Sequence, residues 1–276
     1  MTLDLFALVL FASFLHAAWN VAVKSGGNKL FETGLTALGA LAPAIIPVFY
    51  LPPILPAAYP FIFVSCFCHF GYYLFMAKAY QQSDLSLSYP LMRGSAPLIT
   101  TLALFFLAKS PTLQSLAGII LLSTGIISLA FEQLIISKSS LRPALITALW
   151  ISGYTVLDGL GANQSGSGVS YACWLFVGQA IPISIYLLTK FGRTYLTYAK
   201  ANFKRGFLGG VASFFAYAIA LYAMTQCSIA SVAALRESSV IFGLLLAVIF
   251  LHEKLTKRRI IAVLLVALGA AILKMA

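Results

Sequence analysis

Charged residues are scarce in this chain, since Asp, Glu, Lys and Arg together make up 9% of its 276 residues and only 7 residues are acidic. Its three histidines, His16, His69 and His252, lie in separate segments, and no Asp-rich motif occurs. A membrane-embedded hydrolase or transferase would need paired carboxylates, a metal cluster or a nucleophile beside a base. The sequence therefore argues against an enzyme, and we expect no cofactor and no metal site.

Cysteine and long hydrophilic segments are also rare. The four cysteines, Cys66, Cys68, Cys173 and Cys227, all fall in apolar runs, and Cys-Phe-Cys is not the C-x-x-C spacing of a zinc or redox site. We expect buried free thiols that act as small hydrophobic residues. No large loop or soluble domain is evident, which argues against a membrane scaffold or regulator.

Hydrophobic residues dominate instead, at 61% of the chain with a mean hydropathy of +0.96. Soluble domains do not have this composition. A helix that crosses a bilayer needs roughly 20 apolar residues, and ten stretches of that kind are predicted at 3–23, 31–51, 58–80, 84–107, 113–131, 141–160, 169–189, 204–226, 229–251 and 256–274. The first begins at Asp4 without a basic cluster and is interpreted as a helix rather than a signal peptide. We predict an all-α, multi-pass protein of the cell inner (cytoplasmic) membrane.

The net charge of +11 follows the predicted topology. Lysines and arginines cluster in the connections after odd-numbered helices, whereas the other connections contain only Lys109. The positive-inside rule then places the odd connections in the cytoplasm and both termini outside. This explains the basic charge without nucleic acid, and the expected partners are a small-molecule substrate and membrane lipid, with the chain a monomer or weak homodimer. The basic stretch 190–205 is predicted to lie on the lipid surface as an interfacial helix.

Two pairs of similar segments indicate an internal repeat. The segment SYPLMRGSAPLITTLALFFLAKSPT, which contains Arg93, resembles SVAALRESSVIFGLLLAVIFLHEKL, which contains Arg236. Likewise LHAAWNVAVKSGGN resembles WISGYTVLDGLGAN and places Trp19 over Tyr154. We predict two five-helix repeats, 1–135 and 136–276, and an odd number of spans makes the second repeat inverted. In inverted-repeat transporters the substrate site lies between the repeats, which here places it near the two arginines.

An ionised side chain at the bilayer centre is costly, so Arg93 and Arg236 need compensation. They either hold a carboxylate, phosphate or phosphonate in a water-accessible cavity, or are locked to helix-end carbonyls, Glu237 or Asp158. Glu237 directly follows Arg236, and adjacent helical residues point about 100° apart, so these two are predicted not to pair. Glu237 is expected either to pair permanently with Arg93 or to carry a proton.

Further candidates lie on polar or aromatic stripes of the predicted helices. His16 and Asn20 share one stripe of the first helix, with Trp19 beside it. His16 either relays a proton or hydrogen-bonds a neighbouring helix. Tyr73 and Tyr217 are near mid-span of the third and eighth helices and are predicted to line the cavity. The predicted substrate-binding set is thus Arg93, Arg236, Glu237, Trp19, Asn20, Tyr73 and Tyr217, with Glu237 and His16 as proton-coupling candidates.

An acidic residue, a glycine spacing and two prolines lead to three further predictions. Asp158 precedes the turn-rich LGANQSGSG and is assigned equally to an interfacial loop and to the site. Gly206 and Gly210 form a G-x-x-x-G that predicts close helix packing. Pro90 and Pro97 flank Arg93, which predicts a kink in the fourth helix and none in the proline-free ninth.

The chain resembles the ten-helix EamA-type members of the drug/metabolite transporter superfamily. The matching features are the five-plus-five repeat, HAAWNVAVK at the end of the first helix, Pro90 in the fourth, and LAVIFLHEKLTKRRIIAVLLVALGAAIL near the end, with Glu253, Leu255, Thr256 and Gly269. The first repeat departs from the family at Lys109-Ser110-Pro111, where the acidic residue is missing. The resemblance implies a transporter of amino acids, other metabolites or drugs, often outward.

The function predicted from the sequence is secondary transport of small organic solutes by alternating access. The two arginines favour amino acids or related metabolites with an anionic group. The alternatives are an exporter of cationic or neutral drugs and metabolites, a channel, and, less favoured, a membrane-embedded enzyme.

Overall fold

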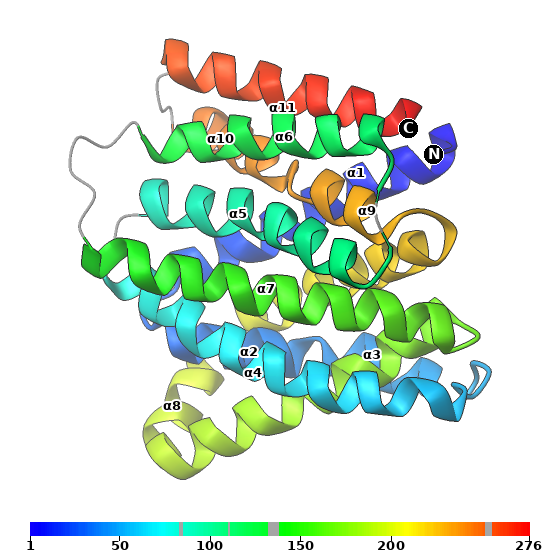
Figure 1. Ribbon diagram of the computed structural model, residues 1–276. Helices are drawn as coiled ribbons and strands as arrows, with labels where there is room; N and C mark the ends of the chain where they lie inside the picture. The colour runs from blue at the N-terminus through cyan, green and yellow to red at the C-terminus, as the bar shows by residue number, and fades with distance from the viewer. Residues whose placement is uncertain (83–84, 110, 132–137, 252–255) are drawn as a thin grey trace.

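The computed structural model describes residues 1–82, 85–109, 111–131, 138–251 and 256–276, and the regular elements in these ranges are all helical. The helices pack lengthwise into a bundle (Figure 1). The all-α prediction is confirmed. Glu253 and Leu255 of the family resemblance, and the predicted helix start at residue 84, lie outside the described residues.

The helices follow the predicted spans closely. The first half of the chain contains α1 (Leu3–Ser25), α2 (Lys29–Gly39), α3 (Leu41–Val48), the short 3₁₀ helix η1 (Pro56–Ala58), α4 (Tyr59–Gln82), α5 (Leu85–Phe106) and α6 (Leu113–Ala130). The second half contains α7 (Lys138–Gln164), α8 (Gly168–Gln226), α9 (Ile229–Arg236), α10 (Ser239–Leu251) and α11 (Lys257–Met275).

The predicted helix 31–51 is divided into α2 and α3 at Ala40. The division lies where α2 meets α8 at very close range, because a Cβ added to Gly39 would lie 2.5 Å from the carbonyl oxygen of Gly206. Gly210 approaches the same backbone equally closely. The packing prediction from the G-x-x-x-G spacing is therefore confirmed.

The predicted helix 229–251 is also divided, between α9 and α10. The backbone N–H groups of Glu237 and Ser238 donate to carbonyls three residues back, at 3.0 Å each, so the chain tightens into a 3₁₀-type turn. By contrast, α5 runs as one helix through Pro90 and Pro97. The helix that is interrupted is thus the α9–α10 segment, which has no proline, and not its repeat partner α5, which has two.

One long helix, α8, contains two predicted spans, 169–189 and 204–226. Gly192 separates them with φ 47° and ψ −120°, a non-helical conformation that glycine adopts without a steric penalty. The chain turns back on itself at this bend, at the lower left of Figure 1. The basic stretch 190–205 is helical, as predicted.

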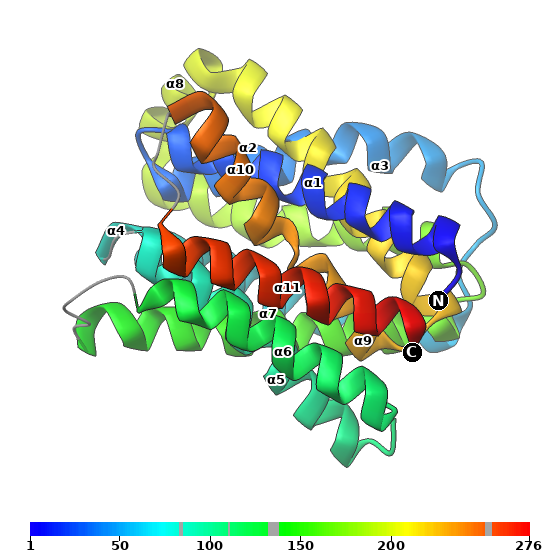
Figure 2. The ribbon, with the colours of Figure 1, turned by 90° about the horizontal axis from the view of Figure 1, so that it is seen from above.

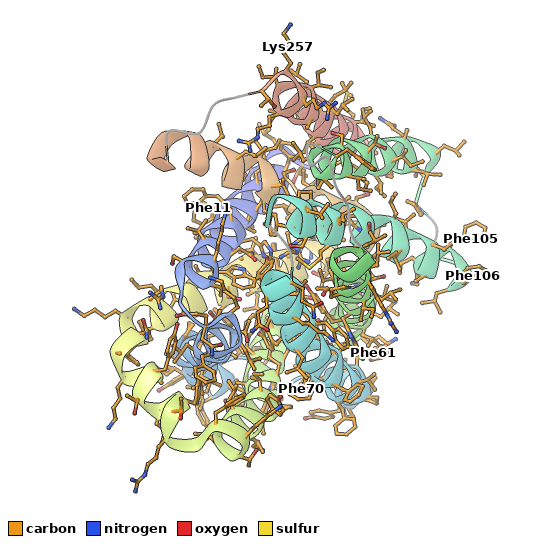
Figure 3. The ribbon with its side chains drawn as sticks, turned by 90° about the vertical axis from the view of Figure 1, so that its left-hand side faces the viewer. Phe11, Phe61, Phe70, Phe105, Phe106 and Lys257 are labelled. Atoms are coloured by element: carbon orange, nitrogen blue, oxygen red, sulfur yellow. The ribbon has the colours of Figure 1, made fainter. Side chains whose placement is uncertain are left out.

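The outer surface of the bundle is apolar. Phe105 and Phe106 are 62% and 78% exposed and project from the bundle in Figure 3, as does Phe11. Within the described residues, six helical segments are long and apolar enough to cross a membrane. These features fit a multi-pass membrane protein, and the count of ten spans remains a prediction.

The two termini lie side by side in both Figure 1 and Figure 2, and the Met1 amino group donates to the carbonyl of Lys274 at 3.4 Å. Termini at one end of the bundle agree with the predicted even number of crossings. The last helix, α11, packs along α6, and a Cβ on Gly269 would lie 2.8 Å from the carbonyl oxygen of Gly118. Glycine at both positions permits this close contact.

A polar contact joins α2 to α8 near one end of the bundle. Glu32 is 1% exposed. Its Oε1 accepts a hydrogen bond from the Tyr198 hydroxyl at 2.6 Å and forms an ion pair with Arg205. Asn202 also accepts from the Arg205 guanidinium, at 2.6 Å. The buried carboxylate is therefore neutralised and hydrogen-bonded by one face of α8.

Candidate functional site

Arg93 from α5 and Arg236 at the end of α9 meet in the centre of the bundle, and each is 1% exposed. Glu237 lies between them: its Oε1 is 3.2 Å from Nη1 of Arg93 and 3.6 Å from Nη2 of Arg236. Residues that are far apart in the sequence thus form one buried cluster of two cations and one anion. The expectation that Arg93 and Glu237 pair is confirmed.

The expectation that Glu237 and Arg236 do not pair is wrong. It assumed a continuous helix, in which adjacent side chains diverge by about 100°. The helix ends at Arg236, and the turn at Glu237 and Ser238 breaks that geometry. Glu237 therefore contacts both guanidinium groups.

A small pocket lies beside this cluster, between α1, α4, α7, α8 and α9. It is lined by His16, Trp19, His69, Tyr72, Tyr73, Tyr154, Phe176, Gln179, Ser213, Tyr217 and Arg236. Of the predicted site residues, Arg236, Trp19, Tyr73, Tyr217 and His16 are in this lining. Arg93, Glu237 and Asn20 are outside it.

The two arginines have different surroundings. Arg236 lies over the ring of Tyr217, with Cζ 4.9 Å from the ring centroid, and its buried Nε has no hydrogen-bond partner among the described residues. Arg93 donates to Glu237 and contacts His16 behind the pocket wall. Arg236 is therefore the guanidinium that faces the pocket, with a donor left for a ligand.

His16 lies between two donors. The indole N–H of Trp19 donates to Nδ1 at 3.1 Å, and Nη2 of Arg93 contacts Nε2. A neutral imidazole has a single acceptor nitrogen, and neither Trp nor Arg can accept. An added proton would remove that acceptor and place a third cation in the cluster, so the geometry favours a neutral His16.

Asn20 is satisfied by its own surroundings. Its amide donates to the carbonyl of His16 at 2.8 Å, and its oxygen accepts from the Tyr80 hydroxyl at 3.5 Å. These partners hold Asn20 between α1 and α4, away from the pocket lining. The position of Asn20 therefore does not support the prediction that it contacts substrate.

Asp158 lies within α7 and is 0% exposed, so of its two assignments the interfacial loop is wrong. Its Oδ2 accepts from the Tyr217 hydroxyl at 2.7 Å and lies 3.1 Å from Nε2 of His69, and its Oδ1 accepts from the Tyr171 hydroxyl at 3.0 Å. The turn-rich sequence that suggested a loop begins at Leu160, but α7 continues through its first residues and ends at Gln164. Asp158 therefore lies behind the pocket lining, in contact with the lining residues His69 and Tyr217.

Sequence reasoning missed His69 and Tyr154 as pocket residues. Their rings stack with centroids 4.1 Å apart and an interplanar angle of 17°. Tyr154 occupies the position that the repeat aligns with Trp19, and both residues line the pocket. The repeat alignment thus contained the signal that could have identified Tyr154.

Metal-ligating residues do not converge in the part of the chain that the structure describes, where no group of three or more His, Cys, Asp or Glu side chains could hold an ion. The four cysteines are free, and three of them are buried. The site offers a guanidinium, aromatic faces and a carboxylate rather than a metal centre.

Comparisons with known proteins agree with this fold. Residues 143–275 match the model of the EamA-like transporter family. A solved crystal structure superposes on 100% of this chain and 98% of its own with a TM-score of 0.73, at 16% sequence identity, which shows a shared fold. No curated protein sequence matches. The family match confirms the resemblance that the sequence motifs indicated.

Proposed function

We propose that the protein moves amino acids or related metabolites with an anionic group, since residues 143–275 match the model of the EamA-like transporter family, which implies a transporter of small solutes. The observation that carries the proposal is Arg236, a buried guanidinium that faces the pocket with an unpaired Nε. A planar guanidinium binds carboxylates well because it donates parallel hydrogen bonds.

The charges around the pocket support a zwitterionic or anionic solute. Arg93 and Glu237 neutralise one another at 3.2 Å, which leaves the charges of Arg236 and Asp158, both in contact with Tyr217. Aromatic rings, among them Trp19, line the same pocket as Arg236. A carboxylate would bind at Arg236 while an apolar side chain contacts the rings.

The proposal includes alternating access by two inverted units, 1–135 and 136–276, in the cytoplasmic membrane. It is supported by the pocket lining, which contains Trp19 and Tyr154, the pair aligned by the repeat, and Tyr73 and Tyr217 from the third predicted span of each unit. In inverted-repeat transporters the substrate site lies at such an interface. Arg93 and Glu237 then hold the units together, with Glu237 as the shared counter-charge.

The runner-up is an exporter of cationic or neutral compounds. It is favoured by the aromatic lining, which can bind cations through ring faces, and by the buried carboxylate of Asp158. The two functions predict opposite preferences between carboxylate and ammonium ligands.

The test compares three probes of one shape by thermal shift and titration calorimetry on the purified protein: L-phenylalanine, 3-phenylpropionate without the ammonium group, and phenethylamine without the carboxylate. We expect the two carboxylates to bind and Arg236→Gln to weaken them roughly 10- to 150-fold, the loss of about 1.5–3 kcal/mol for a hydrogen bond to a charged group.

Arg205→Gln is the matched control, because it removes a guanidinium that pairs with Glu32 and neither lines the pocket nor contacts Glu237. It should lower stability while the preference for carboxylates remains. Binding of phenethylamine alone, unchanged in Arg236→Gln, would establish the runner-up instead. Uptake of the binding probe into proteoliposomes then measures transport.

A further inference from the structure

Asp158 and its donors form a second polar centre on the pocket wall, separate from the arginine cluster. We infer that Asp158 is the carboxylate that takes up the coupling proton of transport, and that Tyr217 links it to the anion site at Arg236. The inference rests on the proposed solute transport, and it assigns the coupling ion to a residue different from Glu237 and His16.

Tyr217 has the geometry of a link because it touches both centres. Its hydroxyl donates to Oδ2 of Asp158 at 2.7 Å, while its ring lies against the guanidinium of Arg236, 4.9 Å from Cζ. Protonation of Asp158 would therefore move Tyr217, and with it the ring that contacts the guanidinium of Arg236.

The titratable and charged groups that face Asp158 are known from each packed helix. They are His69, Cys66 and Cys68 from α4, with Tyr73 beside His69; Tyr171 and Tyr217 from α8; Tyr154 from α7 itself; and Arg236 of α9 beyond the ring of Tyr217. None of these groups is a cation in direct contact with Asp158 unless His69 is protonated. The carboxylate is held by the hydroxyl groups of Tyr171 and Tyr217 and by the ring of His69.

Glu237 and His16 are less suited to carry the proton. Glu237 lies 3.2 Å and 3.6 Å from two guanidinium groups and is therefore already the counter-charge of two cations. His16 faces the donors Arg93 and Trp19, and a protonated imidazole would oppose both.

The proton balance connects the two centres. With neutral histidines, the two arginines are offset by Glu237 and Asp158, and a proton on Asp158 leaves one net positive charge beside the pocket. The new O–H on Oδ2 also reduces its acceptor capacity, so the Tyr217 hydroxyl is released toward the pocket. Proton and anion therefore bind together, which is the requirement for coupled movement.

The first experiment needs no substrate. Infrared difference spectra between about pH 8 and about pH 5.5 show a carboxyl band when a buried carboxylate takes up a proton. We expect a carboxyl band in the wild type and in Glu237→Gln, and no band in Asp158→Asn. A band that disappears in Glu237→Gln and persists in Asp158→Asn would overturn the inference.

The second experiment measures the affinity for 3-phenylpropionate across the same pH range. The wild type should bind at least about fivefold more tightly at the lower pH, the lower end of typical coupling between sites. Asp158→Asn should bind with no pH dependence. An unchanged pH profile in that variant would also overturn the inference.

Tyr171→Phe and Tyr217→Phe form a matched pair that keeps the carboxylate, so the test does not depend on the folding of Asp158→Asn. Each variant removes one hydroxyl donor to Asp158, but only Tyr217 also contacts Arg236. We expect the pH dependence of binding to persist in Tyr171→Phe and to be lost in Tyr217→Phe. Equal profiles in the two variants would refute the link.

The infrared result separates the two proposals. A carboxyl band assigned to Asp158 in a protein that binds none of the carboxylate probes would refute solute binding at Arg236 and support the proton site. Binding of 3-phenylpropionate without that band would do the reverse.

Discussion

Gly210→Ala is predicted to disrupt the contact between α2 and α8, although it adds a single methyl group. A Cβ at this position would lie 2.5 Å from the carbonyl oxygen of Thr36 and closer still to backbone atoms of Gly39 and Ala40. These are backbone atoms, so no rotamer change can relieve the clash. The two helices would have to move apart along the contact that joins the halves of the chain.

The neighbouring glycine provides the matched control. A Cβ on Gly209 would lie 3.4 Å from the Cβ of Ala22 and 3.7 Å from Oγ1 of Thr36, which are ordinary van der Waals distances. Gly209→Ala should therefore gain the helix preference of alanine, about 0.8–1.0 kcal/mol. Gly210→Ala has the same gain and in addition an overpacking cost of typically 1–3 kcal/mol or more.

Thermal unfolding in detergent, followed by the fluorescence of the three tryptophans, measures the difference. With about 2 °C per kcal/mol for a chain of this size, Gly210→Ala should unfold about 2–6 °C below Gly209→Ala. If Gly210→Ala is as stable as Gly209→Ala, the helices are not packed as closely as the structure indicates, and the reasoning fails.

Two further predictions concern buried charges and use the same assay. Glu237→Gln leaves two unneutralised guanidinium groups and should cost about 3–5 kcal/mol, whereas Arg93→Gln leaves one cation beside one anion and should cost less. A larger loss in Arg93→Gln would contradict this charge balance. Glu32→Gln should cost about 1–3 kcal/mol, because it weakens a buried acceptor of Arg205, while Asp4→Asn at an exposed helix start should have little effect. Equal midpoints for these two variants would argue against the α2–α8 polar contact.

Much of the fold was predictable because its signals are local. Apolar runs of membrane length predicted helices at nearly the observed positions, and the G-x-x-x-G spacing predicted the close contact at Gly206 and Gly210. Burial of both arginines followed from their apolar flanks. The division at Glu237 was not predictable, because no proline or glycine lies next to it, whereas Gly39 and Pro43 flank the division at Ala40 and are a local break signal.

The sequence by itself determined an all-helical membrane protein with two arginines at its centre, since the composition and length of an apolar run are properties of each segment alone. Only the tertiary structure decided which arginine faces the pocket and which is neutralised, because that depends on where the α9 helix stops. Likewise, Asp158 became a site residue through hydroxyl and imidazole donors on α4 and α8. A buried polar residue takes its role from partners that other helices supply, and those partners are not encoded in its neighbours along the chain.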